Sequence, residues 1–84
     1  MIERLAKEFC EVAARLLGAS AFDVPVDVSL SILAKGDDHS SIYQLLIEIE
    51  SMHPDVKIDL SDEPFWPSIW RLAEITAHQM RVSA

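Results

Sequence analysis

The strongest constraint on the fold is a helical repeat of apolar residues near the start of the chain. Between residues 2 and 17 these residues recur every three or four positions: Ile2, Leu5, Phe9, Val12, Ala13 and Leu16. This spacing places them on one face of an α-helix, with charged residues such as Glu8 and Arg15 on the other. Gly18 follows where a left-handed C-terminal cap is common. The pattern predicts an amphipathic helix that needs partners to cover its apolar face.

Two later segments repeat the helical pattern. Residues 40–52 carry an apolar stripe, with Tyr43 and Ile47 flanking it: Ile42, Leu45, Leu46, Ile49 and Met52. Pro67 is expected to be the first residue of a final helix, because proline there loses no hydrogen bond. The apolar face of that helix is Ile69, Trp70, Leu72, Ala73, Ile75, Thr76 and Met80. Trp66 and Trp70 are spaced to face the same way, and we expect both in the core.

The segments between these helices alternate in the manner of strands. Apolar residues occupy every second position from Val24 to Ile32, and again at Val56, Ile58 and Leu60. Two such strands would make a small α+β domain. However, Pro25 cannot donate to a strand ladder, and two short strands alone are marginal in water. We favour long loops whose apolar residues pack into a helical core.

Length and charge narrow the class of protein. The 84 residues fit a single domain, residues 1–84, with a net charge of -7. Seven basic residues without a cluster argue against nucleic-acid binding, which depends on neutralising phosphates. An acidic surface suits basic protein partners, although the same charge can serve solubility alone.

The absence of a targeting pattern and the single cysteine indicate the cellular compartment that we expect for this protein. The chain has no apolar run long enough to span a membrane, and its start lacks the pattern of a signal peptide. Cys10 is the single cysteine, so an internal disulfide and a thiolate metal cluster are excluded. We therefore expect a cytoplasmic protein that does not associate with membranes.

Catalytic and metal-binding patterns are weak. Asp38, His39 and Ser40 are the residue types of a hydrolytic triad, but triad members must converge from separate elements. Neighbours at a helix start point in different directions, so we do not expect an enzyme. His53 and His78 lie far along the chain from His39, and the spacing of the three histidines does not suit zinc.

The segment from Gly36 to Ser41 begins the central helix. Asp37 and Asp38 suit the positive end of the helix dipole, and Asp38, Ser40 or Ser41 could cap it. With the helix that follows, Leu45-Leu46-Ile47-Glu48-Ile49-Glu50, and the later Val56-Lys57-Ile58-Asp59 and Ser61-Asp62-Glu63, this segment resembles the acyl and peptidyl carrier proteins. The resemblance implies an all-α, four-helix bundle with a long first loop and a short third helix.

The resemblance also implies a covalent cofactor. Carriers attach 4'-phosphopantetheine to a serine at this helix start and hold an acyl or aminoacyl group on it as a thioester. Matching His39-Ser40 to the His-Ser motif of peptidyl carriers makes Ser40 the attachment site, which we favour, with Ser41 as an alternative. A gap-free match of the apolar register instead puts His39 there. That reading implies a carrier-like interaction module without the prosthetic group, since histidine has no hydroxyl to modify.

The partners implied are a phosphopantetheinyl transferase and acyl- or aminoacyl-transferring enzymes. Their basic docking surfaces would meet Asp37, Asp38, Glu48 and Glu50, four acidic residues in or near the central helix. A monomer is the default for the family. Fatty acyl, aminoacyl and polyketide carriers share these features, so the sequence leaves the cargo open.

Overall fold

The structure, a computed structural model, describes residues 1–18, 20–34, 40–61, 63 and 65–83. Its elements are α1 (Ile2–Leu17), a 3₁₀ turn η1 (Ala21–Asp23), α2 (Leu30–Ala34), α3 (Ser40–Met52) and α4 (Ile69–Ser83). In these ranges the backbone forms no strand beyond an isolated antiparallel bridge between Ser29 and Ser68. The all-α prediction is confirmed, and the α+β alternative is wrong.

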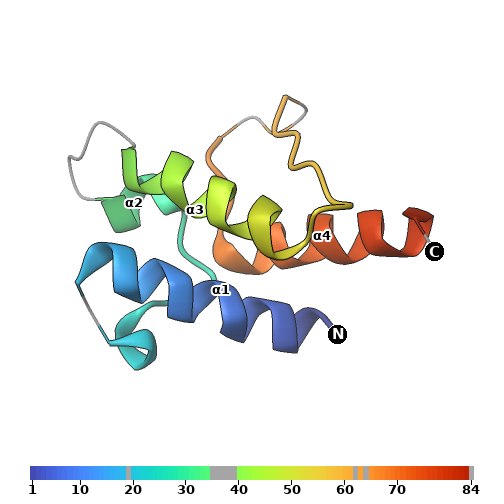
Figure 1. Cartoon of the computed structure of the whole chain (residues 1–84). Helices are drawn as coiled ribbons and strands as arrows, with labels where there is room; N and C mark the ends of the chain where they lie inside the picture. Colours follow the sequence, from blue (N-terminus) through green and yellow to red (C-terminus); the bar gives the residue numbers. More distant parts are fainter. Residues whose placement is uncertain (19, 35–39, 62, 64, 84) are drawn as a thin grey trace.

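The helices form a bundle around α1. This helix packs against both α3 and α4, and α2 contacts α3. Figure 1 shows α1 running opposite to α3 and α4, with both chain termini at one end of the bundle and α2 beside the start of α3 at the other. The core takes its largest fully buried apolar side chains from all three long helices: Phe9, Ile49, Ile69 and Leu72.

The short third helix implied by the family resemblance falls between α3 and α4, in a stretch where residues 62 and 64 lie outside the described residues. The described residues between 53 and 68 contain no helix. The short α-helix that the structure describes is α2, which lies in the first loop. Ser29 starts it, since its hydroxyl accepts the backbone N–H of Ser31 at 3.2 Å and its carbonyl accepts that of Leu33. Leu30 then anchors α2 in the core.

Helix α1 ends as its sequence predicts. Gly18 has φ +69°, in the left-handed region, and its N–H donates to the carbonyl of Ala14. A Cβ added at Gly18 would meet no atom within 4 Å, so a substitution there strains the backbone without a steric clash.

Replacing Gly18 with alanine should therefore lower the free energy of unfolding by about 1 kcal/mol, from left-handed strain alone. Gly18→Asn should cost less, because asparagine tolerates this conformation. Urea denaturation followed by far-UV circular dichroism measures both. Equal losses in the two variants would contradict the assignment of the cost to backbone conformation.

The two alternating segments do not pair with each other as strands: the first runs into α2 at Leu30, and the second is bonded to helices. Val56 is buried and Ile58 half-buried, while Lys57 between them faces solvent, so the alternation does mark an inward and an outward side. The backbone N–H of Ile58 donates to the Glu50 carboxylate of α3 at 2.9 Å. On the other side, the side-chain amide of Gln79 accepts the N–H of Lys57 at 2.8 Å and donates to its carbonyl. Side chains of α3 and α4 thus take the place of a neighbouring strand.

The first alternating segment, from residue 26 to the start of α2, forms hydrogen bonds with residues at and just before the start of α4. The N–H of Trp70 donates to the carbonyl of Val26 at 2.9 Å, and the N–H of Leu30 donates to that of Pro67 at 3.0 Å. The hydroxyl of Ser29 also donates to the carbonyl of Trp66 at 2.9 Å. These bonds satisfy backbone groups that would otherwise need a strand partner.

Gln79 should matter to stability more than its partly exposed position suggests. Gln79→Ala should lower the free energy of unfolding by about 1 kcal/mol, because both bonds to Lys57 are lost. Gln79→Glu should also be destabilising, because a carboxylate can accept the N–H of Lys57 but cannot donate to the Lys57 carbonyl. Thermal and urea denaturation measure the effect, with Gln44→Ala on the exposed face of α3 as the control. A Gln79→Glu variant as stable as the wild type would refute the role given to the amide donor.

Three details of the helix predictions are wrong. Helix α4 starts at Ile69, because the hydroxyl of Ser68 accepts the N–H of Arg71 at 3.2 Å and caps the helix two residues later than predicted from Pro67. Trp70 is partly exposed at the surface, one step around the helix from the fully buried Ile69. Met52, predicted in the buried stripe of α3, is exposed at the last residue of that helix.

Candidate functional site at the start of α3

Helix α3 has one buried and one exposed face, and this register places the candidate serines. Ile42, Leu45 and Ile49 are buried against the other helices. Ser40 is exposed and is the first residue of the helix. It shares its face with Tyr43 and Ile47, three and seven residues later, which are also exposed. The side chain of Ser40 is therefore presented on the outside of the bundle.

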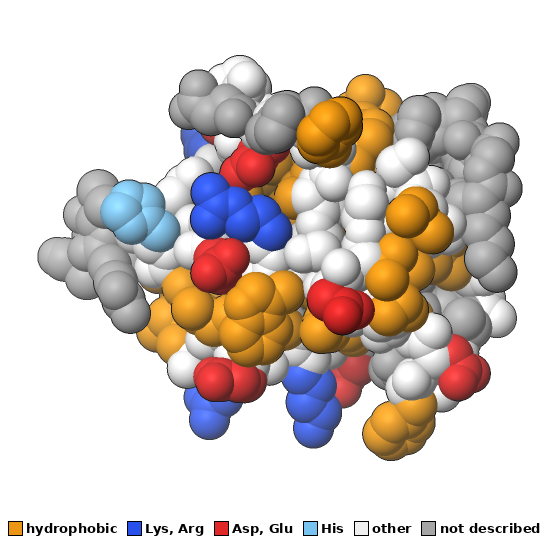
Figure 2. Space-filling model, turned by 180° about the vertical axis from the view of Figure 1, so that it is seen from behind, with side chains coloured by type: hydrophobic (Ala, Val, Ile, Leu, Met, Phe, Trp, Pro, Cys, Tyr) orange, Lys and Arg blue, Asp and Glu red, His pale blue; other side chains and the backbone are white. Residues whose placement is uncertain are grey.

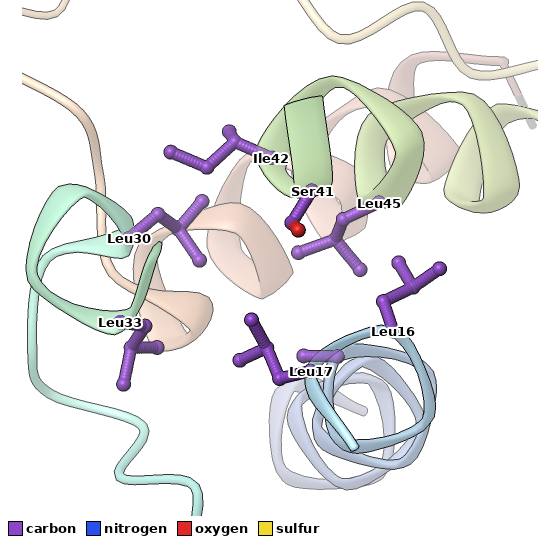
Figure 3. A pocket seen from close by; sticks show the side chains of 8 residues that line it. Leu16, Leu17, Leu30, Leu33, Ser41, Ile42 and Leu45 are labelled. Atoms are coloured by element: carbon purple, nitrogen blue, oxygen red, sulfur yellow. The ribbon is translucent and has the colours of Figure 1, made fainter. Parts of the chain in front are cut away.

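Ser41 has a different environment. It is half-buried and lines a small pocket between α1, α2 and α3, where its hydroxyl is the one polar side-chain group among the described lining residues (Figure 3). Ala13 and Ile42 form part of the apolar lining. The rest is formed by leucine side chains of all three helices: Leu16, Leu17, Leu30, Leu33 and Leu45. The cavity volume is about 20 Å³, the room for a single water. Of the two serines, Ser40 is the more accessible to another protein.

Part of the predicted motif cannot be placed. Asp37, Asp38 and His39 lie outside the described residues. The choice between Ser40 and His39 as the residue at the attachment position therefore stays a prediction.

The two acidic residues predicted for partner binding on α3 have partners within the chain. The Oε2 atom of Glu48 lies 3.0 Å from Nη2 of Arg15, which joins α3 to α1. Glu50 is partly buried and accepts the N–H of Ile58. Sequence reasoning missed both roles because Arg15 lies 33 residues away and a backbone N–H leaves no trace in a sequence. Both glutamate side chains are partly exposed. Glu48 forms an ion pair with α1, and Glu50 holds the backbone of the segment that follows α3.

Other reactive groups lie away from the start of α3. Burial, and secondly the charge of Glu11, raise the pKa of the Cys10 thiol, which donates to the carbonyl of Val24 at 3.7 Å. Hydrogen bonding from Ser61 lowers the pKa of Asp59, an exposed carboxyl in the loop before α4. A buried thiol with a raised pKa is a poor nucleophile.

The two described histidines, His53 and His78, lie on different segments of the chain. His53, just after α3, places Nε2 3.0 Å from Oε1 of Glu8 and its ring edge-on to Phe9. His78 is exposed on α4. Within the described ranges, no three histidine, cysteine, aspartate or glutamate side chains come close enough together to hold a metal ion. In the same ranges, no helix has the length and apolar character needed to cross a membrane.

Comparison with family models, with curated proteins and with solved structures found no match to this chain. The class of protein that the structure defines is therefore a small, acidic, helical domain with an exposed serine at the first residue of α3.

Proposed function

We propose that the protein is a carrier that holds an acyl or aminoacyl group as a thioester on a 4'-phosphopantetheine arm attached to Ser40. The observation that carries the proposal is the exposure of Ser40 at the first residue of α3. A transferase must reach the serine hydroxyl from outside, and Ser40 offers that access while Ser41 faces the leucine-lined pocket. The sequence resemblance of residues 36–80 to carriers supports the same residue.

The attachment reaction assigns a simple role to Ser40. Its Oγ would attack the phosphorus that bears the pantetheine of coenzyme A, forming a phosphodiester and losing its proton to the transferase. The bond to the other phosphate breaks, and adenosine 3',5'-bisphosphate leaves. When bound, the arm supplies the thiol that carries the cargo. The chain itself presents the serine on a rigid helix and leaves the chemistry to partner enzymes.

The test is incubation of the protein with coenzyme A and a promiscuous phosphopantetheinyl transferase, followed by intact-protein mass spectrometry. We expect a mass gain of one phosphopantetheine in the wild type and in Ser41→Ala, and none in Ser40→Ala. A known carrier protein in the same tube shows that the transferase is active. If the wild type gains no mass beside a modified control, the carrier proposal fails; if Ser41→Ala alone loses the gain, the attachment site is Ser41.

The second candidate is an interaction module that keeps the helical bundle but carries no prosthetic group. The observation that favours it is an open groove of mixed polar and apolar lining that exposes Ile32 and Phe65 and needs no cofactor to explain it. The mass experiment separates the two candidates, since an interaction module gains no mass.

A further inference from the structure

An open groove of about 850 Å³ lies between α2 and the segment that leads into α4. Its apolar lining comes from Ile32 of α2 and from three residues of the segment before α4: Leu60, Phe65 and Trp66. Ile32 is 65% exposed and Phe65 82% exposed, which is unusual for side chains of this size. Neighbouring exposed apolar side chains of this kind mark interaction sites.

The apolar surface continues from the groove onto α3. The rings of Trp66 and Tyr43 meet edge to face, with centroids 5.5 Å apart and an interplanar angle of 82°. Tyr43 is itself exposed, and Ile47 lies one turn further along the same exposed face. The groove and the exposed face of α3 therefore form one surface, with aromatic side chains at its centre that are well suited to anchor a partner.

The charges around the groove specify the kind of partner. Its described lining contains two carboxylates, Asp27 and Glu63, and neither lysine nor arginine. Glu63 is neutralised by Arg71, whose Nε lies 2.9 Å from Oε1 of Glu63. Asp27 is exposed and makes no ion pair with any part of the chain that the structure describes. On the face drawn in Figure 2, hydrophobic side chains are interspersed with both acidic and basic ones.

We propose that this groove binds a segment of another protein in which a bulky apolar side chain stands beside lysine or arginine. The apolar side chain packs on Ile32 and Phe65, and the cation pairs with Asp27. A second copy of the chain is a poor occupant, because two molecules of net charge -7 repel each other. The inference goes beyond the carrier proposal, since the groove needs no prosthetic arm and binds whether or not Ser40 is modified.

The test is an NMR titration of the ¹⁵N-labelled full chain with a synthetic heptapeptide whose central tryptophan is flanked by lysines. We expect saturable shifts of the amides of Asp27, Ile32, Phe65 and Trp66. Replacing the flanking lysines with glutamates should weaken binding by about tenfold, because the peptide then carries the charge sign of the groove. Replacing the central tryptophan with alanine should weaken it by a similar factor.

Variants of the protein locate the contacts. Phe65→Ala should weaken binding of the lysine-flanked peptide by about tenfold, and Asp27→Asn by about threefold, as expected for an exposed ion pair. Both side chains are exposed, so both variants should stay folded. Phe22→Ala is the matched control, because Phe22 is fully exposed and lies outside the groove, and it should bind as the wild type does.

Four results would each overturn the proposal. The peptide could cause no shifts, or it could shift amides away from the groove. Binding could be equally tight with glutamate and lysine flanks, which would remove the role of Asp27. Finally, the groove amides could shift on dilution of the protein alone, which would make a second copy the occupant.

Discussion

Replacing Phe9 with alanine is expected to lower the free energy of unfolding by about 3–5 kcal/mol. Phe9 is fully buried at the centre of α1, and its ring meets that of His53 with centroids 6.4 Å apart. Removing the ring leaves a cavity that the three long helices can close only in part. A domain of this length has a total stability on the order of 5–10 kcal/mol, so the variant should lose a large part of it and unfold at a much lower urea concentration.

The matched control is Phe22→Ala, which makes the same chemical change on a side chain that is 100% exposed. This variant should stay within about 0.5 kcal/mol of the wild type. Urea denaturation followed by far-UV circular dichroism measures both, because the signal reports the helices. Similar losses in the two variants would mean that α1 does not direct Phe9 into the core.

The second large effect is expected at Ile49 of α3. This side chain is fully buried, and Ile49→Ala should cost about 2–5 kcal/mol. Ile47→Ala, two residues earlier on the exposed face, should cost less than about 1 kcal/mol. Both variants replace the same side chain in the same helix, so helix propensity cancels between them. The same denaturation experiment gives the difference.

The Ile49 and Ile47 pair also tests the candidate site. Ser40 lies seven residues before Ile47 and therefore on the same face of α3. If Ile47→Ala were the more damaging change, the helix would be rotated and Ser40 would point into the bundle. The proposed modification by a transferase would then lose its structural basis, and so would the continuity of the groove with α3.

The long helices were predictable because their signals are local. The apolar spacing of residues 2–17 and the glycine that follows predicted α1 and its left-handed cap, and the spacing of residues 40–52 predicted α3 with the bounds that the structure gives. In each case the periodicity and the cap lie within a few residues of the helix they define. The exposure of Ser40 also follows from this register, once Ile42 and Ile49 are known to face inward.

The candidate groove could not be predicted in this way. Ile32 lies in α2, about thirty residues before Phe65 and Trp66, and no local pattern brings it beside them. Phe65 carries no signal in the sequence that separates an exposed aromatic residue from a buried one. Its exposure depends on how the segment before α4 is held against α2 and α4.

The sequence by itself thus determined an acidic, all-α domain, the places of its long helices and the serine at the start of α3. Only the tertiary structure decided how the alternating segments are used. Alternation shows which side chains turn inward, but it does not show which groups accept the backbone hydrogen bonds. Here Gln79 accepts the N–H of Lys57 and Glu50 accepts that of Ile58. A local sequence pattern does not reveal hydrogen-bond partners that lie far along the chain. For the same reason it did not reveal the ion pair between Glu48 and Arg15.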